Sequence, residues 1–272
     1  MQKIEFIKMH GLGNDFVIID RRTNNVEINK DIIHKLSDRK TGAGCDQVIT
    51  IDKNISSDHD VRIEIFNPNG DSAEACGNGT RCVAKLLFNE NNITKLRLKS
   101  LAGILNAQKI NDDIISVNLG KISHHWKDIP LAKEVDTLNI PIRLENFSPG
   151  VAINVGNPHI VFFGKNINLL DLNNIGPQIE NHKLFPQKTN IEIVQIVNRK
   201  VITMRVWERG AGITLACGSG ACAAVYAGML KDLTDTNVEV KLAKGSLQVK
   251  IKNDEAIMMG PATESFRGYI EI

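Results

Sequence analysis

An internal repeat restricts the fold of this chain more than any other feature of its sequence. Cys76-Gly-Asn-Gly-Thr has a counterpart in Cys217-Gly-Ser-Gly-Ala. Further landmarks recur in the same order at a nearly constant separation: Gly13-Asn14 with Gly156-Asn157, Gln47 with Asn190, Asn67 with Glu208, and Gly103 with Gly245. The period is about the size of a domain, so the 272-residue chain is predicted to hold two copies of one fold.

Each repeated cysteine lies between a strand pattern and a helix pattern. Alternating apolar residues come before it at Val61–Ile65 and Ile202–Val206, and small residues follow it. No charged residue occurs from Gly210 to Leu230, so the helix predicted after Cys217 should be buried on every side. The predicted fold class is α/β. It consists of two pseudo-symmetric, strand-rich domains, each a barrel-like sheet around a buried central helix, with the active site in the cleft between them.

The landmarks also predict the domain boundaries. The first copy should comprise residues 1–119, and the second copy residues 120–262. Residues 263–272 have no counterpart in the first copy. They are predicted to return to an edge of the first domain's sheet, where unpaired backbone groups would accept another strand.

Composition argues against several classes of function. A net charge of +2 gives no basic surface for nucleic acid, and 42% hydrophobic with 24% charged residues is typical of globular proteins. The uncharged run after Gly210 is nearly long enough for a membrane span, but it lacks the Leu, Ile and Val density of one, so no membrane association is expected. Five irregularly spaced cysteines form no disulfide framework, and the first ten residues lack the apolar core of a secretory signal, so a cytoplasmic location is predicted.

The two repeated cysteines predict a specific chemistry. A cysteine at the first turn of a helix lies beside backbone N–H groups without intrahelical partners, which can bind an anion and stabilise a thiolate. That effect is worth about 1 kcal/mol and should lower the pKa of the thiol by about one unit. If Cys76 and Cys217 face opposite sides of one carbon, one sulfur can remove a proton while the other returns one, which inverts a stereocentre. No lysine in a recognisable cofactor loop and no metal-ligand cluster occurs in the sequence, so neither a cofactor nor a metal is expected.

Other interpretations of the cysteines remain open at this point. Cys45, Cys82 and Cys222 are predicted to be packing residues, because a buried cysteine usually behaves as a small apolar side chain. A zinc site would need a second Cys or His at ligand spacing, and a redox pair would need Cys-x-x-Cys. A non-catalytic protein could use the two glycine-rich helix N-termini to bind anions or phosphate, and Cys76 would then be replaceable.

Four segments resemble the diaminopimelate epimerase family, and the resemblance covers essentially the whole chain. They are K-M-H-G-L-G-N-D-F at Lys8–Phe16, C-G-N-G-T-R-C at Cys76–Cys82, G-N-P-H at Gly156–His159, and E-R-G-A-G-I-T-L-A-C-G-S-G at Glu208–Gly220. The resemblance implies cofactor-independent epimerisation of LL-2,6-diaminopimelate to meso-diaminopimelate by a homodimer, in lysine and peptidoglycan precursor biosynthesis. A related racemase of the proline or hydroxyproline type is the nearest alternative, since it would keep the fold and change the substrate.

Matched by motif, the resemblance also assigns roles to residues. Cys76 and Cys217 would be the catalytic acid/base pair, with His159 and Glu208 auxiliary to them. The residues implied to bind the diamino dicarboxylate substrate are Asn14, Gln47, Asn67, Gly77, Asn78, Asn157, Asn190, Glu208, Arg209, Gly218 and Ser219. Two positions depart from the family's pattern. Ile213 stands where a Glu is usual, and Phe266 stands where an aromatic hydroxyl is common, in a C-terminal segment that contributes to the dimer.

Overall fold

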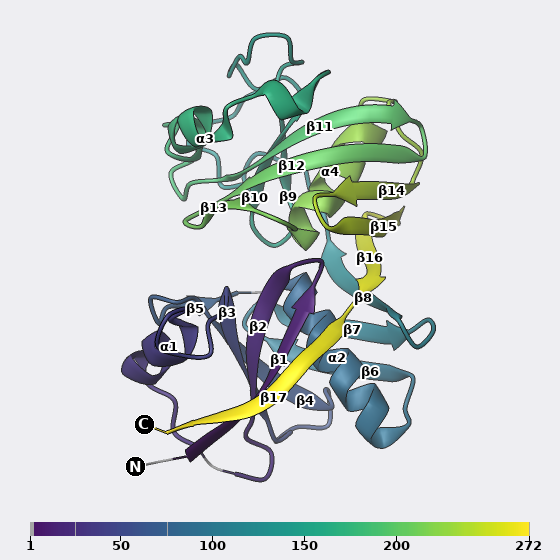
Figure 1. Ribbon diagram of the computed structural model, residues 1–272. Coiled ribbons are helices and arrows are strands. Elements are labelled where there is room, and N and C mark those ends of the chain that lie inside the picture. The colour runs from purple at the N-terminus through teal and green to yellow at the C-terminus, as the bar shows by residue number, and fades with distance from the viewer. Residues whose placement is uncertain (1–2, 25, 75, 272) are drawn as a thin grey trace. The chain divides into compact units, whose positions relative to one another are not determined.

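The chain folds into two compact units. A computed structural model describes residues 3–24, 26–74 and 76–271 (Figure 1). The first unit comprises Met1–Val117 with Gly260–Ile272, and the second unit comprises Asn118–Met259. The domain boundaries predicted from the sequence, after residues 119 and 262, lie two and three residues from this division.

Strands dominate both units. The first contains β1 (Lys3–Gly11), β2 (Asn14–Asp20), α1 (Lys30–Ser37), β3 (Gln47–Asp52), β4 (Val61–Phe66), β5 (Ser72–Ala73), α2 (Gly77–Asn91), β6 (Lys95–Ser100), β7 (Gly103–Lys109) and β17 (Thr263–Glu271). The second contains β9 (Val151–Asn154), β10 (Pro158–Phe163), η1 (Ile167–Leu169), α3 (Leu172–Glu180), β11 (Asn190–Asn198), β12 (Val201–Glu208), β13 (Gly212–Thr214), α4 (Gly218–Leu230), β14 (Asn237–Leu242) and β15 (Gly245–Lys252). The chain passes from one unit to the other within β8 (Ile114–Lys121) and returns within β16 (Glu255–Pro261).

The same strand pairing occurs in both units. In the first, β2 is parallel to β3, β3 antiparallel to β4, β4 parallel to β6, and β6 antiparallel to β7. In the second, β10, β11, β12, β14 and β15 repeat that sequence of pairings. The registers agree as well, because Phe16 lies opposite Gln47, and His159 lies opposite Asn190 at the equivalent positions of the repeat. The internal duplication predicted from the sequence is confirmed.

The C-terminal segment belongs to the sheet of the first unit. β17 runs antiparallel to β1, with Thr263 opposite His10 and Glu271 opposite Lys3. It pairs along almost the whole length of β1, so the end of the chain adds a strand to the copy in which the chain began.

One helix is buried in each unit. α4 contacts β9, β10, β11, β12, β14 and β15, so strands from across the second unit surround it. Its Gly, Ala, Ser and Cys residues give it the small diameter that this position needs, and residues 220–228 are all buried. α2 contacts β1, β2, β6 and β7 in the same way. The predicted sheet around a central helix is therefore confirmed in each copy.

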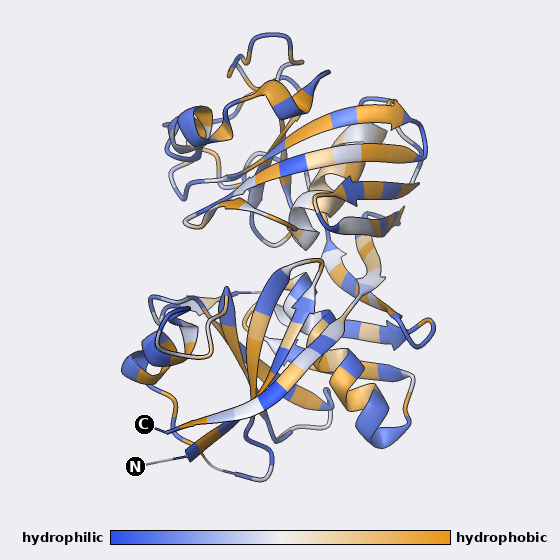
Figure 2. Ribbon diagram, viewed as in Figure 1, coloured by the Kyte–Doolittle hydropathy of each residue, from blue (hydrophilic) through white to orange (hydrophobic). Residues whose placement is uncertain are grey.

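Hydropathy explains which faces of the strands are buried. On β14 and β15 hydrophobic and hydrophilic residues alternate along the strand (Figure 2). Four of the apolar members, Val238, Val240, Leu247 and Val249, are fully buried. α4 spans only 13 residues, and a bilayer span needs about 20. Among the described residues, no helix is both long enough and apolar enough to cross a membrane.

Candidate active site

Each repeated cysteine caps the N-terminus of the buried helix in its unit. The backbone of Cys76 is extended (φ −143°, ψ 105°), and its Sγ accepts a hydrogen bond from Gly79 N at 3.4 Å. Cys217 has a similar backbone (φ −122°, ψ 115°), and its Sγ accepts from Gly220 N, also at 3.4 Å. Gly77 and Gly218 are the first helical residues, so the prediction of a cysteine at a helix mouth is confirmed twice.

The glycines of the two motifs are needed for close packing. A Cβ atom on Gly79 would lie 2.5 Å from Ile49 Cδ1, and one on Gly220 would lie 2.6 Å from Glu192 Oε1. Each helix therefore begins in direct contact with a β-strand, β3 in the first unit and β11 in the second. The second glycine of each Cys-Gly-x-Gly motif allows this contact.

An amide side chain lies beside Cys76. Asn14 Oδ1 is 3.8 Å from Cys76 Sγ and accepts a hydrogen bond from Asn78 Nδ2 at 3.1 Å. In the same unit, Gln47 Nε2 donates to Asn67 Oδ1 at 3.0 Å. We call Cys76, Asn14, Asn78, Gln47 and Asn67 the Cys76 cluster. Cys76 itself is partly exposed.

Carboxylates act on Cys217 instead. Glu208 accepts a hydrogen bond from the Thr214 hydroxyl, and Cys217 Sγ lies 3.5 Å from Ser219 Oγ. Burial raises the pKa of Glu208, although hydrogen bonds from Thr214 and Cys217 oppose the rise. A carboxyl group with a raised pKa exchanges protons more readily near neutral pH, as a proton relay to a thiol requires.

The pKa of Cys217 is shifted in the direction opposite to the prediction. Burial raises the pKa of this thiol well above its ordinary value, and the charges of Glu208 and Glu192 raise it further. Hydrogen bonds from Ser219 and from Gly220 N–H act the other way and are outweighed. The expected lowering by about one unit, taken from the helix N-terminus alone, is wrong for Cys217 because desolvation and two carboxylates dominate.

A buried histidine–glutamate pair lies beneath the second motif. His159 Nδ1 is 2.8 Å from Glu192 Oε1, and His159 Nε2 is 2.8 Å from Asn157 Oδ1. Both side chains are fully buried. We call Cys217, Ser219, Glu208 and this His159–Glu192–Asn157 chain the Cys217 cluster.

Glu192 is a site residue that sequence reasoning missed. Its Oε2 is buried and has no hydrogen-bond partner within residues 3–24, 26–74 and 76–271. The repeat did contain a signal, because Glu192 and His159 occupy the positions that Ile49 and Phe16 hold in the first copy, where both residues are apolar. A charged residue that replaces an apolar one at a fully buried strand position rarely serves packing alone.

Asn190 and Arg209 are joined through the backbone. Asn190 Oδ1 accepts from Arg209 N at 2.9 Å, and Asn190 Nδ2 donates to the carbonyl of Pro158 at 2.9 Å. The Arg209 guanidinium donates to Gln187 O at 3.1 Å. Asn190 thus ties the loop after β12 to the start of β10 and fixes where the Arg209 side chain begins.

The remaining cysteines are core residues, as predicted. Cys82 and Cys222 have no exposed surface, and burial raises the pKa of Cys82 to about 12. Cys45 is 3% exposed, with its sulfur 3.7 Å from Ser37 Oγ, and burial raises its pKa as well. Buried cysteines of this kind behave as small apolar side chains.

Solved structures place the chain in a known fold class of repeated strand-rich units. A phenazine biosynthesis protein of the PhzF family from Bacillus anthracis is 18% identical, with a TM-score of 0.71 and coverage of 100% of both chains. A hydroxyproline epimerase from Agrobacterium vitis is 12% identical, with a TM-score of 0.71, and the match covers 99% of this chain and 91% of that one. At these identities the likeness is one of fold.

Sequence comparison then assigns the family. The family described as diaminopimelate epimerase matches residues 6–125 and 151–264. A diaminopimelate epimerase of Pelagibacter ubique (strain HTCC1062) is 42% identical over 267 residues, 96% of each chain. A diaminopimelate epimerase of Wolbachia (strain wRi) is 45% identical over 251 residues, 92% of this chain and 93% of the relative. The chain belongs to the diaminopimelate epimerase family, so the resemblance read from the four motifs is confirmed.

Proposed function

We propose that the protein epimerises LL-2,6-diaminopimelate to meso-diaminopimelate without a cofactor, using Cys76 and Cys217 as a pair of acid/base groups. The observation that carries the proposal is the repetition of a cysteine-capped buried helix in a member of this family. An enzyme that inverts a carbon needs one proton acceptor and one proton donor on opposite faces of it. A duplicated fold supplies one such group per copy.

The proton balance of the reaction is simple. One cysteine, as thiolate, takes the α-proton, so that the C–H bond breaks and an S–H bond forms. The carbanion is stabilised by its carboxylate, which the backbone N–H groups of Gly77, Asn78, Gly218 and Ser219 would bind at the two helix N-termini. The other cysteine, as thiol, gives its proton to the opposite face. The raised pKa of Cys217 favours the thiol form of this side chain. This supports a role for Cys217 as the proton donor in one direction of the reaction.

Auxiliary groups differ between the two sulfurs. Glu208, whose charge raises the pKa of Cys217, would take and return the proton of that thiol between turnovers. His159 and Glu192 lie in the same unit beside Asn157, and they would hold the Asn157 amide in one orientation towards substrate. In the first copy, Asn14 would take the place of Asn157 and face the substrate beside Cys76.

The end of the substrate that does not react distinguishes this function from a proline-type racemase. Diaminopimelate carries a second carboxylate and a second ammonium group, which a binding site must pair with charged and amide groups. Arg209, Asn67, Gln47 and Asn190 are the proposed contacts for that end. A proline or hydroxyproline racemase has no use for them.

We propose a cytoplasmic homodimer acting in lysine and peptidoglycan precursor biosynthesis, on a small diamino dicarboxylate. Phe266 and Tyr269 on β17 are 50% and 57% exposed, and apolar surface of this kind on a strand supports a contact with a second copy.

Conversion of LL-diaminopimelate into the meso isomer, followed by chiral chromatography, tests the proposal. Wild-type protein should reach an equilibrium mixture from either isomer, and L-proline and hydroxyproline should remain unchanged. Cys76→Ala and Cys217→Ala are the matched negative controls. Failure of folded, reduced wild-type protein to convert LL-diaminopimelate would falsify the assignment, and turnover of proline would favour the racemase.

A further inference from the structure

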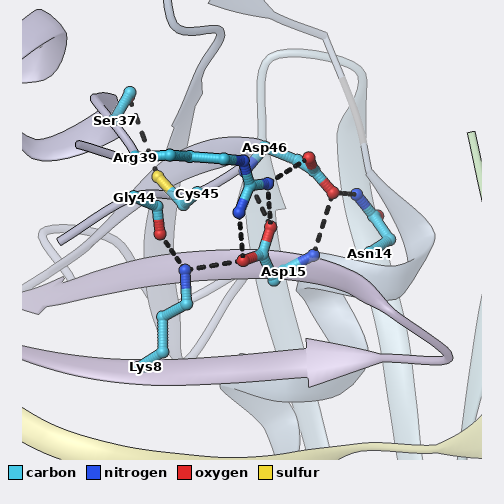
Figure 3. Close-up of polar contacts among 8 residues, drawn as sticks. All are labelled: Lys8, Asn14, Asp15, Ser37, Arg39, Gly44, Cys45 and Asp46. Atoms are coloured by element: carbon cyan, nitrogen blue, oxygen red, sulfur yellow. Dashed lines mark hydrogen bonds and ion pairs between the residues drawn. The ribbon is translucent and has the colours of Figure 1, made fainter.

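A cluster of charged side chains lies against the Cys76 cluster and is not used in the proposed mechanism. Arg39 donates to both oxygens of Asp15, at 3.1 and 2.8 Å, and to Asp46 Oδ1 at 2.7 Å (Figure 3). Lys8 Nζ lies 2.7 Å from Asp15 Oδ2. Asp15 N donates to Asp46 Oδ2 at 3.1 Å, and Asp46 N donates to Asp15 Oδ1 at 3.0 Å. We call Lys8, Asp15, Arg39 and Asp46 the ion cluster.

The loop that carries Asp46 is fixed from several sides. Gly44 N donates to Leu36 O at 2.9 Å, and Cys45 N donates to Ser37 O at 3.2 Å, both at the end of α1. Lys8 of β1 donates to the Gly44 carbonyl (Figure 3). Gly44 has a positive φ of 70°, which favours glycine. These contacts make the loop a fixed support for one carboxylate.

Asp46 is bonded directly to Asn14. Asp46 Oδ2 accepts a hydrogen bond from Asn14 Nδ2 at 2.9 Å (Figure 3). Because an amide has its nitrogen and oxygen on opposite branches, this bond turns Asn14 Oδ1 towards Cys76 Sγ and Asn78 Nδ2. A flipped amide would set its oxygen against the Asp46 carboxylate, and loss of a charge-assisted hydrogen bond disfavours that orientation roughly 10- to 100-fold.

Stability does not explain the Arg39–Asp46 pair. Arg39 is 57% exposed and Asp46 is 40% exposed, and ion pairs at such exposure contribute little to folding. The Lys8–Asp15 pair of the same cluster is largely buried, with side chains 9% and 17% exposed. Arg21 and Asp52, at the other end of β3, form a comparable pair at 2.7 and 2.9 Å without any contact to an amide of the Cys76 cluster among the described residues. The two ion pairs therefore differ in one respect: only Asp46 is also hydrogen-bonded to an amide of the Cys76 cluster.

We propose that Asp46 is a positioning residue for Cys76: held by Arg39 and Asp15, it fixes the Asn14 amide so that its oxygen faces the sulfur and its second N–H is left for the substrate. The inference rests on the proposed function for its catalytic consequence, but the orientation of Asn14 can be tested without substrate. The orienting carboxylate then differs between the two copies, since in the second copy Glu192 acts on Asn157 through His159.

Three variants separate orientation from charge and from folding. Asp46→Ala removes the acceptor that holds Asn14. Asp46→Asn removes the charge but can keep an oxygen at the position that accepts from both Asn14 Nδ2 and Asp15 N, because Arg39 keeps its two bonds to Asp15. Asp52→Ala is the control, since it breaks an Arg–Asp pair at the opposite end of β3 that contacts no amide of the Cys76 cluster among the described residues.

The first measurement is alkylation of Cys76 by iodoacetamide in substrate-free protein, followed by mass spectrometry of its peptide. Asp46→Ala should raise the Cys76 rate about tenfold, because a freed amide can turn its N–H groups to the thiolate. Asp46→Asn and Asp52→Ala should stay within about twofold of wild type. The Cys217 peptide in the same samples is an internal control and should not change. Equal Cys76 rates in all proteins, or equal increases in Asp46→Ala and Asp46→Asn, would overturn the proposal.

The second measurement is turnover with LL-diaminopimelate. Asp46→Ala should lower kcat roughly 10- to 100-fold, as for other misplaced contact groups, and Asp46→Asn should recover most of it. Because Asp46 acts through Asn14, the double variant Asn14→Ala/Asp46→Ala should lie within about threefold of Asn14→Ala. Multiplied effects would contradict the inference. Inactive wild-type protein would instead contradict the proposed function, and the alkylation result would still decide the orientation of Asn14.

Discussion

Cys76 and Cys217 cap equivalent helices in two copies of one fold, yet their surroundings have little in common. Cys76 is partly exposed and lies 3.8 Å from the amide oxygen of Asn14, whose nitrogen donates to Asp46 of the ion cluster. Cys217 is buried beside Glu208, above a His–Glu pair with no exposed surface. The backbone frame is the same, with Sγ accepting from the N–H of the third helical residue in both.

This difference teaches which parts of a duplicated site can change. The helix start, the glycines and the strand beneath them are fixed by steric contact, and both copies keep them. The groups that orient the neighbouring asparagine are free to differ. For the proposed reaction, two sulfurs that perform opposite proton transfers gain from unlike surroundings, because one must give up a proton when the other holds one.

The largest expected effect comes from removing either sulfur. Cys76→Ala and Cys217→Ala should each lower the rate of epimerisation roughly 10²- to 10⁴-fold, since each removes one acid/base group. Both proteins should keep their thermal unfolding midpoints within a few degrees of wild type. Residual epimerisation in only one variant would show that the two cysteines contribute unequally to the rate. Unchanged activity in either variant would contradict the two-base mechanism.

Removing the buried carboxylate of the second copy should have the next largest effect. Glu192→Gln keeps the shape of the side chain but cannot supply the charge that faces His159. Turnover should fall about 10- to 100-fold, as when other supporting groups around an active site are removed. Because the variant also relieves a buried carboxylate oxygen that lacks a partner in the described part of the chain, stability to urea should not fall. Unchanged turnover with lower stability would make the pair purely structural.

The pH dependence of the two thiols should separate the two surroundings directly. Glu208 and Glu192 both raise the pKa of Cys217, so Glu208→Gln should let this thiol ionise at a lower pH. Alkylation of the Cys217 peptide, followed by mass spectrometry from about pH 6 to about pH 10, should begin earlier in the variant. The Cys76 peptide should keep its wild-type profile, and a parallel shift in both would contradict a local effect.

The smallest expected effect concerns stability in acid. The pKa of Asp15 falls from 3.8 to about 2, because hydrogen bonds from Arg39 and Lys8 outweigh the burial that would raise it. A carboxyl group with a lowered pKa stabilises the fold above its unfolded value, and that stability is lost as the pH falls from about 4 to about 2. Asp15→Asn should therefore cost about 1 kcal/mol at neutral pH after allowance for solvent screening.

Urea unfolding of wild type and Asp15→Asn at neutral and acidic pH measures this loss. The difference between the two proteins should shrink as the pH falls below about 4. A difference that stays constant down to acidic pH would mean that the ion cluster stabilises by packing and not by charge. Glu192→Gln in the second copy is the comparison variant for the same unfolding measurements. Its partner His159 is fully buried and, among the described residues, forms no ion pair with the ion cluster.

The repeat made much of this architecture predictable. Landmarks that recur in the same order predicted the equivalent strands, and the uncharged run after Gly210 predicted a helix buried on all sides. Cysteine followed by Gly-x-Gly predicted both helix caps, because only small residues allow the helix to start against a strand. These features depend on local sequence and on the period of the repeat.

Side-chain partners across the fold were not predictable in the same way. Asp46 stands after a glycine-rich turn and looks like an exposed loop residue until the fold brings Asn14, Asp15 and Arg39 to it. The pKa of Cys217 was predicted with the wrong sign, since a helix N-terminus is visible in a sequence while burial and two distant carboxylates are not. Glu192 was predictable only in part. Comparison of the two copies shows a charged residue where the first copy has an apolar one, but it does not identify His159 as the partner of that residue.

The distribution of solvent hydrogen during the first turnover tests the central claim most directly. In deuterated water, a thiol that has taken the α-proton keeps it, while the opposite sulfur delivers deuterium. The account predicts that meso-diaminopimelate formed early from the LL isomer carries one deuterium at the inverted carbon and that recovered LL isomer carries none, with the reverse pattern when the reaction starts from meso. Equal deuterium in product and recovered substrate would mean that one group serves both faces, and would contradict an enzyme built on two sulfurs.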